Sequence, residues 1–185
     1  MAFASLNAYV DAAIMQASMG IPAGENVIFG QRARVLVLAQ NALQVLADKI
    51  SQDTKRRHLL QKSFTVTLTN GVGSISAAML SAAIGYGSVR DADTGANSGQ
   101  GNTLVKVDNY NDLLRYQSPL FGYYNLSNDQ IYTKQISTGD LTATLSPLTV
   151  FCSYVPLATE IPDELQNDAV DLLAGMIKAE MLPNK

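Results

Sequence analysis

Apolar residues between Gln31 and Ile50 recur with the period of an α-helix. Further apolar residues widen the stripe, so that polar residues keep only a narrow remainder of the helix surface. The pattern predicts a long helix that other elements, or another copy of the chain, must cover on several sides. The stripe consists of Val35, Ala39, Ala42, Leu43, Leu46 and Ile50, and it is widened by Leu36, Leu38, Val45 and Ala47.

The same period predicts a helix over residues 3–18 and another over 162–181. Gly20 ends the first. Pro162 suits the first turn of the last helix, where its missing N–H has no helical partner to lose. A shorter helical piece is expected over 53–62.

Between the helices the apolar period falls to two, which predicts strands. Residues 63–69 and 72–76 flank Asn70-Gly71, the strongest short hairpin signal, and are expected to pair with each other. Residues 77–90 are ambiguous and could form a helical turn followed by a strand from Ile84 to Arg90, and a short helix is expected over 109–116. Further strands are expected at 104–107, 122–126, 131–136, 141–145 and 149–155.

This order of elements predicts an α+β fold in a single domain, residues 1–185. Residues 1–62 and 160–182 would form a helical body, and 63–158 a strand-rich lobe. The polar segment 91–103 is rich in Gly, Asn, Ser and Asp, and we expect it to be a mobile loop.

Composition argues against several classes of protein. The 185 residues are 47% apolar and carry a formal charge of −3, which gives no electrostatic reason to expect a nucleic-acid binder. One cysteine, Cys152, and one histidine, His58, cannot make an internal disulfide or a Cys/His zinc site. Because the sequence shows neither a secretory leader nor a long apolar run, we expect a soluble protein made in a cytoplasm.

No catalytic, cofactor-binding or metal site is expected, and the chain is not expected to be an enzyme. His58 stands in a charged stretch and is interpreted as a solvated or interface residue, whereas Cys152 lies among apolar residues and is interpreted as core. The carboxylates that begin the last helix are explained by the helix dipole and by solvation. They are Asp163, Glu164, Asp168 and Asp171.

The only basic cluster follows the long helix. Three interpretations are open: a solvated face, contact with an acidic surface of a neighbouring protein, or contact with phosphate. We name it as the candidate contact with a neighbouring subunit or another partner protein. Its members are Lys55, Arg56, Arg57, His58 and Lys62.

Four runs of sequence carry a resemblance to a known family. They are RARVLVLAQNALQVLADKISQDTKRRHLLQKSFTV, VDNYNDLL, SPLFGYYNLSNDQIYTKQ and TVFCSYVPLATEIPDELQNDAVDLLAGMI. Their layout over residues 30–181 resembles the head-to-tail connector, or adaptor ring, proteins of tailed bacteriophages, especially of short-tailed and crAss-like phages.

The resemblance implies a virion structural protein, assembled in the cytoplasm of the bacterial host, without catalytic residues or cofactors. Such proteins form a closed homo-oligomeric ring of about twelve copies between portal and tail proteins. The ring continues the channel through which DNA passes, and the acidic charge suits a wall that does not bind DNA tightly. The alternatives are a tail-completion or tail-terminator protein, or, in another class, a small-ligand-binding α+β domain with its pocket under loop 91–103.

Overall fold

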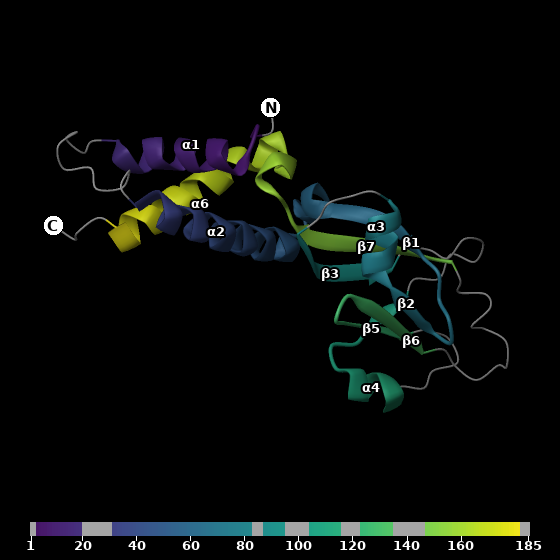
Figure 1. The fold of residues 1–185 in the computed structure, drawn as a ribbon. Helices are drawn as coiled ribbons and strands as arrows, with labels where there is room; N and C mark the ends of the chain where they lie inside the picture. The colour runs from purple at the N-terminus through teal and green to yellow at the C-terminus, as the bar shows by residue number, and fades with distance from the viewer. Residues whose placement is uncertain are drawn as a thin grey trace. The chain divides into compact units, whose positions relative to one another are not determined.

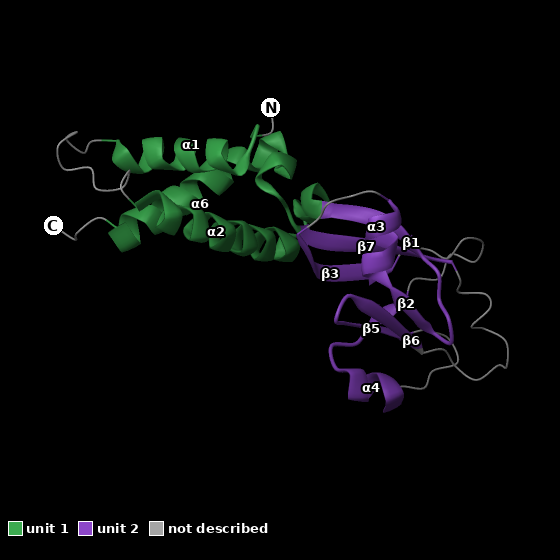
Figure 2. Ribbon diagram, viewed as in Figure 1, with its two compact units in different colours: residues 1–60, 155–185 green, residues 61–154 purple. Residues whose placement is uncertain are grey.

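A computed structural model describes residues 3–19, 31–82, 87–94, 104–115, 123–134 and 147–181. The fold is α+β. The chain forms two compact units, one made of residues 1–60 and 155–185 and the other of residues 61–154 (Figure 2). We call them the helical unit and the strand unit and describe each by itself.

In the helical unit, three helices confirm the three that the apolar period predicts. They are α1 (Leu6–Ser18), α2 (Arg32–Gln52) and α6 (Asp163–Met181). Helix α6 packs against both α1 and α2 and crosses between them in Figure 1. Two 3₁₀ turns complete the unit, η3 (Arg57–Leu60) and η4 (Ala158–Glu160).

The start of α1 and its contact with α6 follow from single side chains. The hydroxyl of Ser5 accepts a hydrogen bond of 3.1 Å from the N–H of Ala8, which is an N-cap. The buried hydroxyl of Tyr9 donates a bond of 2.9 Å to the carbonyl oxygen of Ala169 in α6. Burial raises the pKa of Tyr9, so this hydroxyl remains a donor at neutral pH.

The helical piece expected over 53–62 is confirmed only in part, as the 3₁₀ turn η3. Asp53 takes an extended conformation at the end of α2, and its carboxylate accepts the backbone N–H of Lys55 at 3.0 Å. Such a local side-chain bond competes with helix continuation. Only the turn of η3 follows, and residue 61 already begins a strand.

The strand unit contains two sheets. The first has the order β1 (Gln61–Val66), β7 (Leu148–Val155) and β3 (Ser88–Thr94), with β1 antiparallel to β7. The second has the order β2 (Val72–Ser74), β6 (Gln130–Lys134), β5 (Tyr123–Ser127) and β4 (Val105–Lys106). Helices α3 (Ile75–Ser81) and α4 (Tyr110–Arg115) accompany them.

The core of the strand unit draws on both sheets and on α3. Its buried residues include Phe64, Val66, Ile75, Tyr124, Ile131, Leu148, Val150 and Cys152. The first four residues of the loop expected at 91–103 belong instead to β3, which runs through Thr94. Residues 95–103, the expected strand 141–145 and residues 135–136 lie outside the described part.

The hairpin expected between 63–69 and 72–76 is also wrong, although its turn forms. Asn70 and Gly71 adopt φ of 52° and 79°, and Thr69 exchanges two backbone bonds with Val72. Beyond that bridge the flanking strands do not pair with each other, because β1 pairs along its length with β7 while β2 pairs with β6. The turn therefore passes the chain from one sheet to the other.

The strands on either side of this turn approach closely at Gly73. A Cβ atom built there would lie 2.4 Å from Cγ1 of Val66 and 2.9 Å from Cδ2 of Leu68. Gly175 of α6 differs, because its added Cβ would meet no atom within 4 Å.

We therefore expect opposite effects from the same substitution at the two glycines. Gly73→Ala should destabilise the strand unit by about 1–3 kcal/mol through overpacking. Gly175→Ala, the matched control, should leave stability unchanged or raise it by up to about 1 kcal/mol through helix propensity. Urea unfolding of the full chain measures both, and equal midpoints for the two variants would contradict the close approach.

Candidate functional site

The basic cluster is exposed and divides between the two units. Lys55, Arg56, Arg57 and His58 follow α2 in the helical unit, and all four are exposed. Lys62 is exposed on β1 and belongs to the strand unit. The structure therefore groups four of the five predicted contact residues on one segment.

Arg56 differs from the other members because it ties its segment to α6. Its Nε lies 2.9 Å from Oδ2 of Asp53, and its Nη1 lies 2.6 Å from Oδ2 of Asp168. The hydrogen bonds to Asp53 and then Asp168 raise the pKa of Arg56, and the bond from Arg56 lowers the pKa of Asp53. Arg56 thus has a structural role within the subunit.

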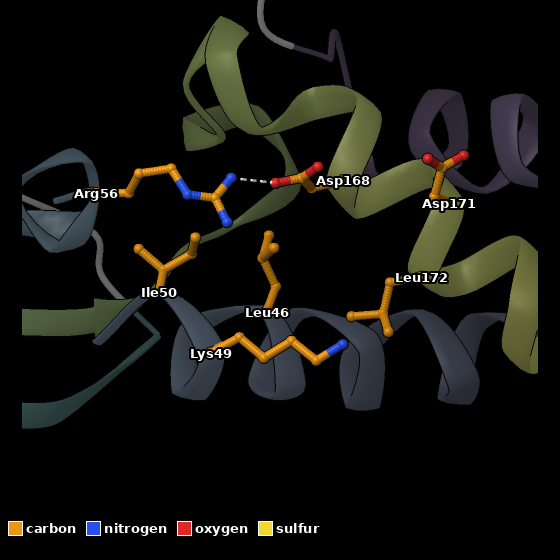
Figure 3. Close-up of a pocket in the computed structure, with 7 residues that line it drawn as sticks. All are labelled: Leu46, Lys49, Ile50, Arg56, Asp168, Asp171 and Leu172. Carbon is orange, nitrogen blue, oxygen red and sulfur yellow. Dashed lines mark hydrogen bonds and ion pairs between the residues drawn. The ribbon is translucent and has the colours of Figure 1, made fainter. Parts of the chain in front are cut away.

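A hollow of about 400 Å³ lies beside this ion pair, between α2 and α6 (Figure 3). Its lining combines three aliphatic side chains with two cationic and two anionic ones. The lining residues are Leu46, Lys49, Ile50, Arg56, Asp168, Asp171 and Leu172. In Figure 3 the guanidinium of Arg56 points toward Asp168, whereas Asp171 lies further along α6.

Two of the carboxylates on α6 do more than complement the helix dipole. Asp168 accepts the bond from Arg56, and Asp171 accepts a bond from the side-chain amide of Gln16 in α1. These partners lie 112 and 155 residues away along the chain. Local sequence signals therefore could not indicate either contact. The helical pattern predicted only that Asp168 and Asp171 lie near the start of the last helix.

The outward face of α2 is exposed but uncharged. Val37, Gln40, Asn41 and Gln44 follow the i, i+3, i+4, i+7 spacing of one helix face, and all four are exposed. No charged residue occurs between Arg34 and Asp48. Within the described part of the chain, the side chains of these four residues make no hydrogen bond or ion pair. We call this face the neutral stripe.

The apolar surplus of α2 is smaller than its sequence suggests. Eight of its residues are buried within the subunit, and Leu36 and Val45 are half-buried. Val37, at 58% exposure, is the one large apolar side chain of α2 that is exposed. The broad apolar surface of α2 is expected to need cover on several sides. Within the subunit, α1, α6 and η3 supply most of that cover.

Helix α1 carries a second exposed apolar surface in this unit. Met15 is 68% exposed, and Met19, directly after the helix, is 74% exposed. The one charged residue of α1, Asp11, forms an ion pair of 2.6 Å with Arg32. We call Met15 and Met19 the methionine edge.

The residues with possible catalytic chemistry stay apart. His58 is exposed in the helical unit, and Cys152 is buried in the core of the strand unit. Burial raises the pKa of the Cys152 thiol to about 12, which keeps it protonated. Among the described residues, no three His, Cys, Asp or Glu side chains gather as a metal site, and no helix is long and apolar enough to cross a membrane.

Neither a scan against models of known protein families nor a search of curated proteins found a match for this chain. Functional inference therefore depends on the surfaces described above and on the resemblance of sequence layout.

Replacing Arg56 with Gln should destabilise the helical unit at neutral pH, and the difference from the wild type should shrink in acid. The pKa of Asp53 lies below its usual 3.8, so its contribution is full above that pH and is lost as the pH falls through the lowered value. Thermal melting between pH 7 and pH 2.5 measures the difference. Lys55→Gln removes a neighbouring charge whose side chain makes no ion pair within the described residues, and it should show no such trend.

Cys152 should resist thiol reagents in the folded protein and react readily in denaturant, because both its burial and its raised pKa suppress the thiolate. Titration with a chromogenic disulfide reagent, with and without urea, measures this. Rapid labelling of the native protein at neutral pH would contradict the core placement.

Proposed function

We propose that this chain is a structural subunit of the ring that joins the portal to the tail in a bacteriophage virion. The observation that carries the proposal is the neutral stripe, an exposed helix face of about two turns within the uncharged run between Arg34 and Asp48. Depletion of charged residues is the compositional mark of a protein–protein interface core. A subunit that packs laterally against copies of itself needs such a face.

The contrast with α6 strengthens the proposal. The exposed positions of α6 carry five charged side chains along its length, as a solvated helix face usually does. They are Asp163, Glu164, Asp171, Lys178 and Glu180. The neutral stripe of α2 is also exposed and belongs to the same unit. Exposure to solvent therefore does not explain why this face lacks charged side chains.

The exposed basic segment after α2 supplies a second surface, which we assign to contact with the portal or another neighbouring protein. Lys55 and His58 are exposed, and neither side chain forms an ion pair within the described part. An acidic surface on the partner would complement them. The net charge of −3 accords with a ring whose channel lets DNA pass without tight phosphate contacts.

The alternative of a small-ligand-binding domain expects a pocket under loop 91–103, of which residues 95–103 lie outside the described part. The hollow between α2 and α6 is a different place, and most of its charged lining is engaged within the subunit. Arg56 and Asp168 are already paired with each other, and Asp171 is engaged by Gln16. Ligand sites usually offer polar groups that are free to fix the orientation of the ligand. We therefore propose a role in assembly and not in catalysis or small-molecule binding.

Electron microscopy and native mass spectrometry of the purified chain, alone and with the portal protein of the same phage, test the proposal. We expect a closed ring, formed either alone or on the portal. A chain that stays monomeric and binds neither portal nor tail proteins overturns it. Binding to the tail-tube end alone would favour a tail-completion or tail-terminator protein, and a ligand-dependent rise in melting temperature would favour a binding domain.

A further inference from the structure

Taking the chain as a ring subunit, as proposed above, we infer that the methionine edge of one copy docks on the neutral stripe of the next. The occupant of the neutral stripe is thus a second copy of this chain. The two surfaces lie on different helices of the same compact unit, and α6 packs against both helices (Figure 1). A single subunit therefore presents two distinct faces.

Ring closure requires two such faces. Cyclic rings of more than two copies are built from heterologous contacts, in which one surface of a subunit meets a different surface of its neighbour. A stripe that paired with the stripe of another copy would be isologous and would stop at a dimer. The neutral stripe on α2 therefore needs a partner surface elsewhere on the subunit.

The composition of the three helices selects the partner surface. The exposed positions of α6 include the five charged side chains named above, and burying them without matched partners is costly. The exposed end of α1 offers Met15 and Met19, two of the most exposed large apolar side chains in the described part of the chain. Methionine is flexible and polarisable, so it adapts to an irregular opposing surface.

The neutral stripe suits this partner chemically. Val37 adds apolar area at its N-terminal end, and the amides of Gln40, Asn41 and Gln44 carry no charge to desolvate. The amides both donate and accept hydrogen bonds, so they can pair with backbone or water at the rim of a contact. The methionine edge and the neutral stripe are both uncharged, so neither face requires a counter-ion from the other.

Two double variants each block one face with carboxylates. Val37→Glu with Gln44→Glu blocks the stripe, and Met15→Glu with Met19→Glu blocks the edge. Asn167→Glu with Ala179→Glu places the same added charge on the exposed, already charged face of α6 and is the matched control. All substituted residues except Met19 lie within helices and all are exposed, so each variant should melt within about 2 °C of the wild type.

Each blocked variant alone should self-associate at least about tenfold more weakly than the wild type, with or without the portal. The α6 control should assemble like the wild type. The decisive sample is an equimolar mixture of the two blocked variants. Each retains one intact face, so together they should form a heterodimer of twice the monomer mass and nothing larger.

Native mass spectrometry of the mixture separates the outcomes. If the wild type assembles but the mixture stays monomeric, or if either blocked variant still forms rings, the pairing is overturned and the ring function stands. If the wild type fails to assemble both alone and on the portal, the proposed function fails, and the pairing fails with it. A homodimer formed by the edge-blocked variant alone would instead show that the stripe pairs with itself.

Discussion

The packing of α6 between α1 and α2 is the contact on which the helical unit depends. Helix α6 comes from the far end of the chain, so the unit cannot close until residues 163–181 have reached the first 52. Alanines on all three helices allow the backbones to approach closely, and the hydroxyl of Tyr9 reaches the carbonyl oxygen of Ala169 at 2.9 Å. Each large side chain buried in this contact contributes about 1.5–3 kcal/mol. The strand unit, residues 61–154, is consequently an insertion between the two halves of the helical unit.

The parts of the fold that could be predicted from sequence are those whose cause is local. The three long helices follow from apolar period, and the turn between β5 and β6 follows from its Asn128-Asp129 pair, whose φ angles are 52° and 56°. Asn70-Gly71 carries the same signal and forms the same kind of turn. There, however, the strand partners are decided by β6 and β7, which lie some sixty to ninety residues further along. A turn signal determines the turn, and long-range pairing decides what the turn connects.

The candidate site shows the same division between local and distant causes. Sequence indicated that Lys55 to His58 would be charged and exposed, because a run of basic residues seldom lies in a core. It could not separate Arg56 from its neighbours, since the distinguishing contact is with Asp168 on another helix. Nor could it show that most of the apolar surface of α2 is covered inside the subunit. The neutral stripe is visible in the sequence as an uncharged run, but only the structure shows which of those residues face outward.

Three ion pairs of the helical unit join charged side chains that lie outside the neutral stripe. Arg32 pairs with Asp11 across α2 and α1, Arg34 with Glu180 across α2 and α6, and Arg56 with Asp168. Exposed pairs of this kind add little stability each. They direct Arg32 and Arg34, at the start of α2, toward α1 and α6, and the stripe that follows is uncharged because no charged residue occurs between Arg34 and Asp48. A face of amides and isolated apolar side chains costs little to desolvate, because no charge loses its hydration. In a closed ring each subunit makes two such contacts, and closure raises the effective concentration for the last one. A closed ring is therefore more stable than the single contact of a heterodimer, although both form through the same pair of faces.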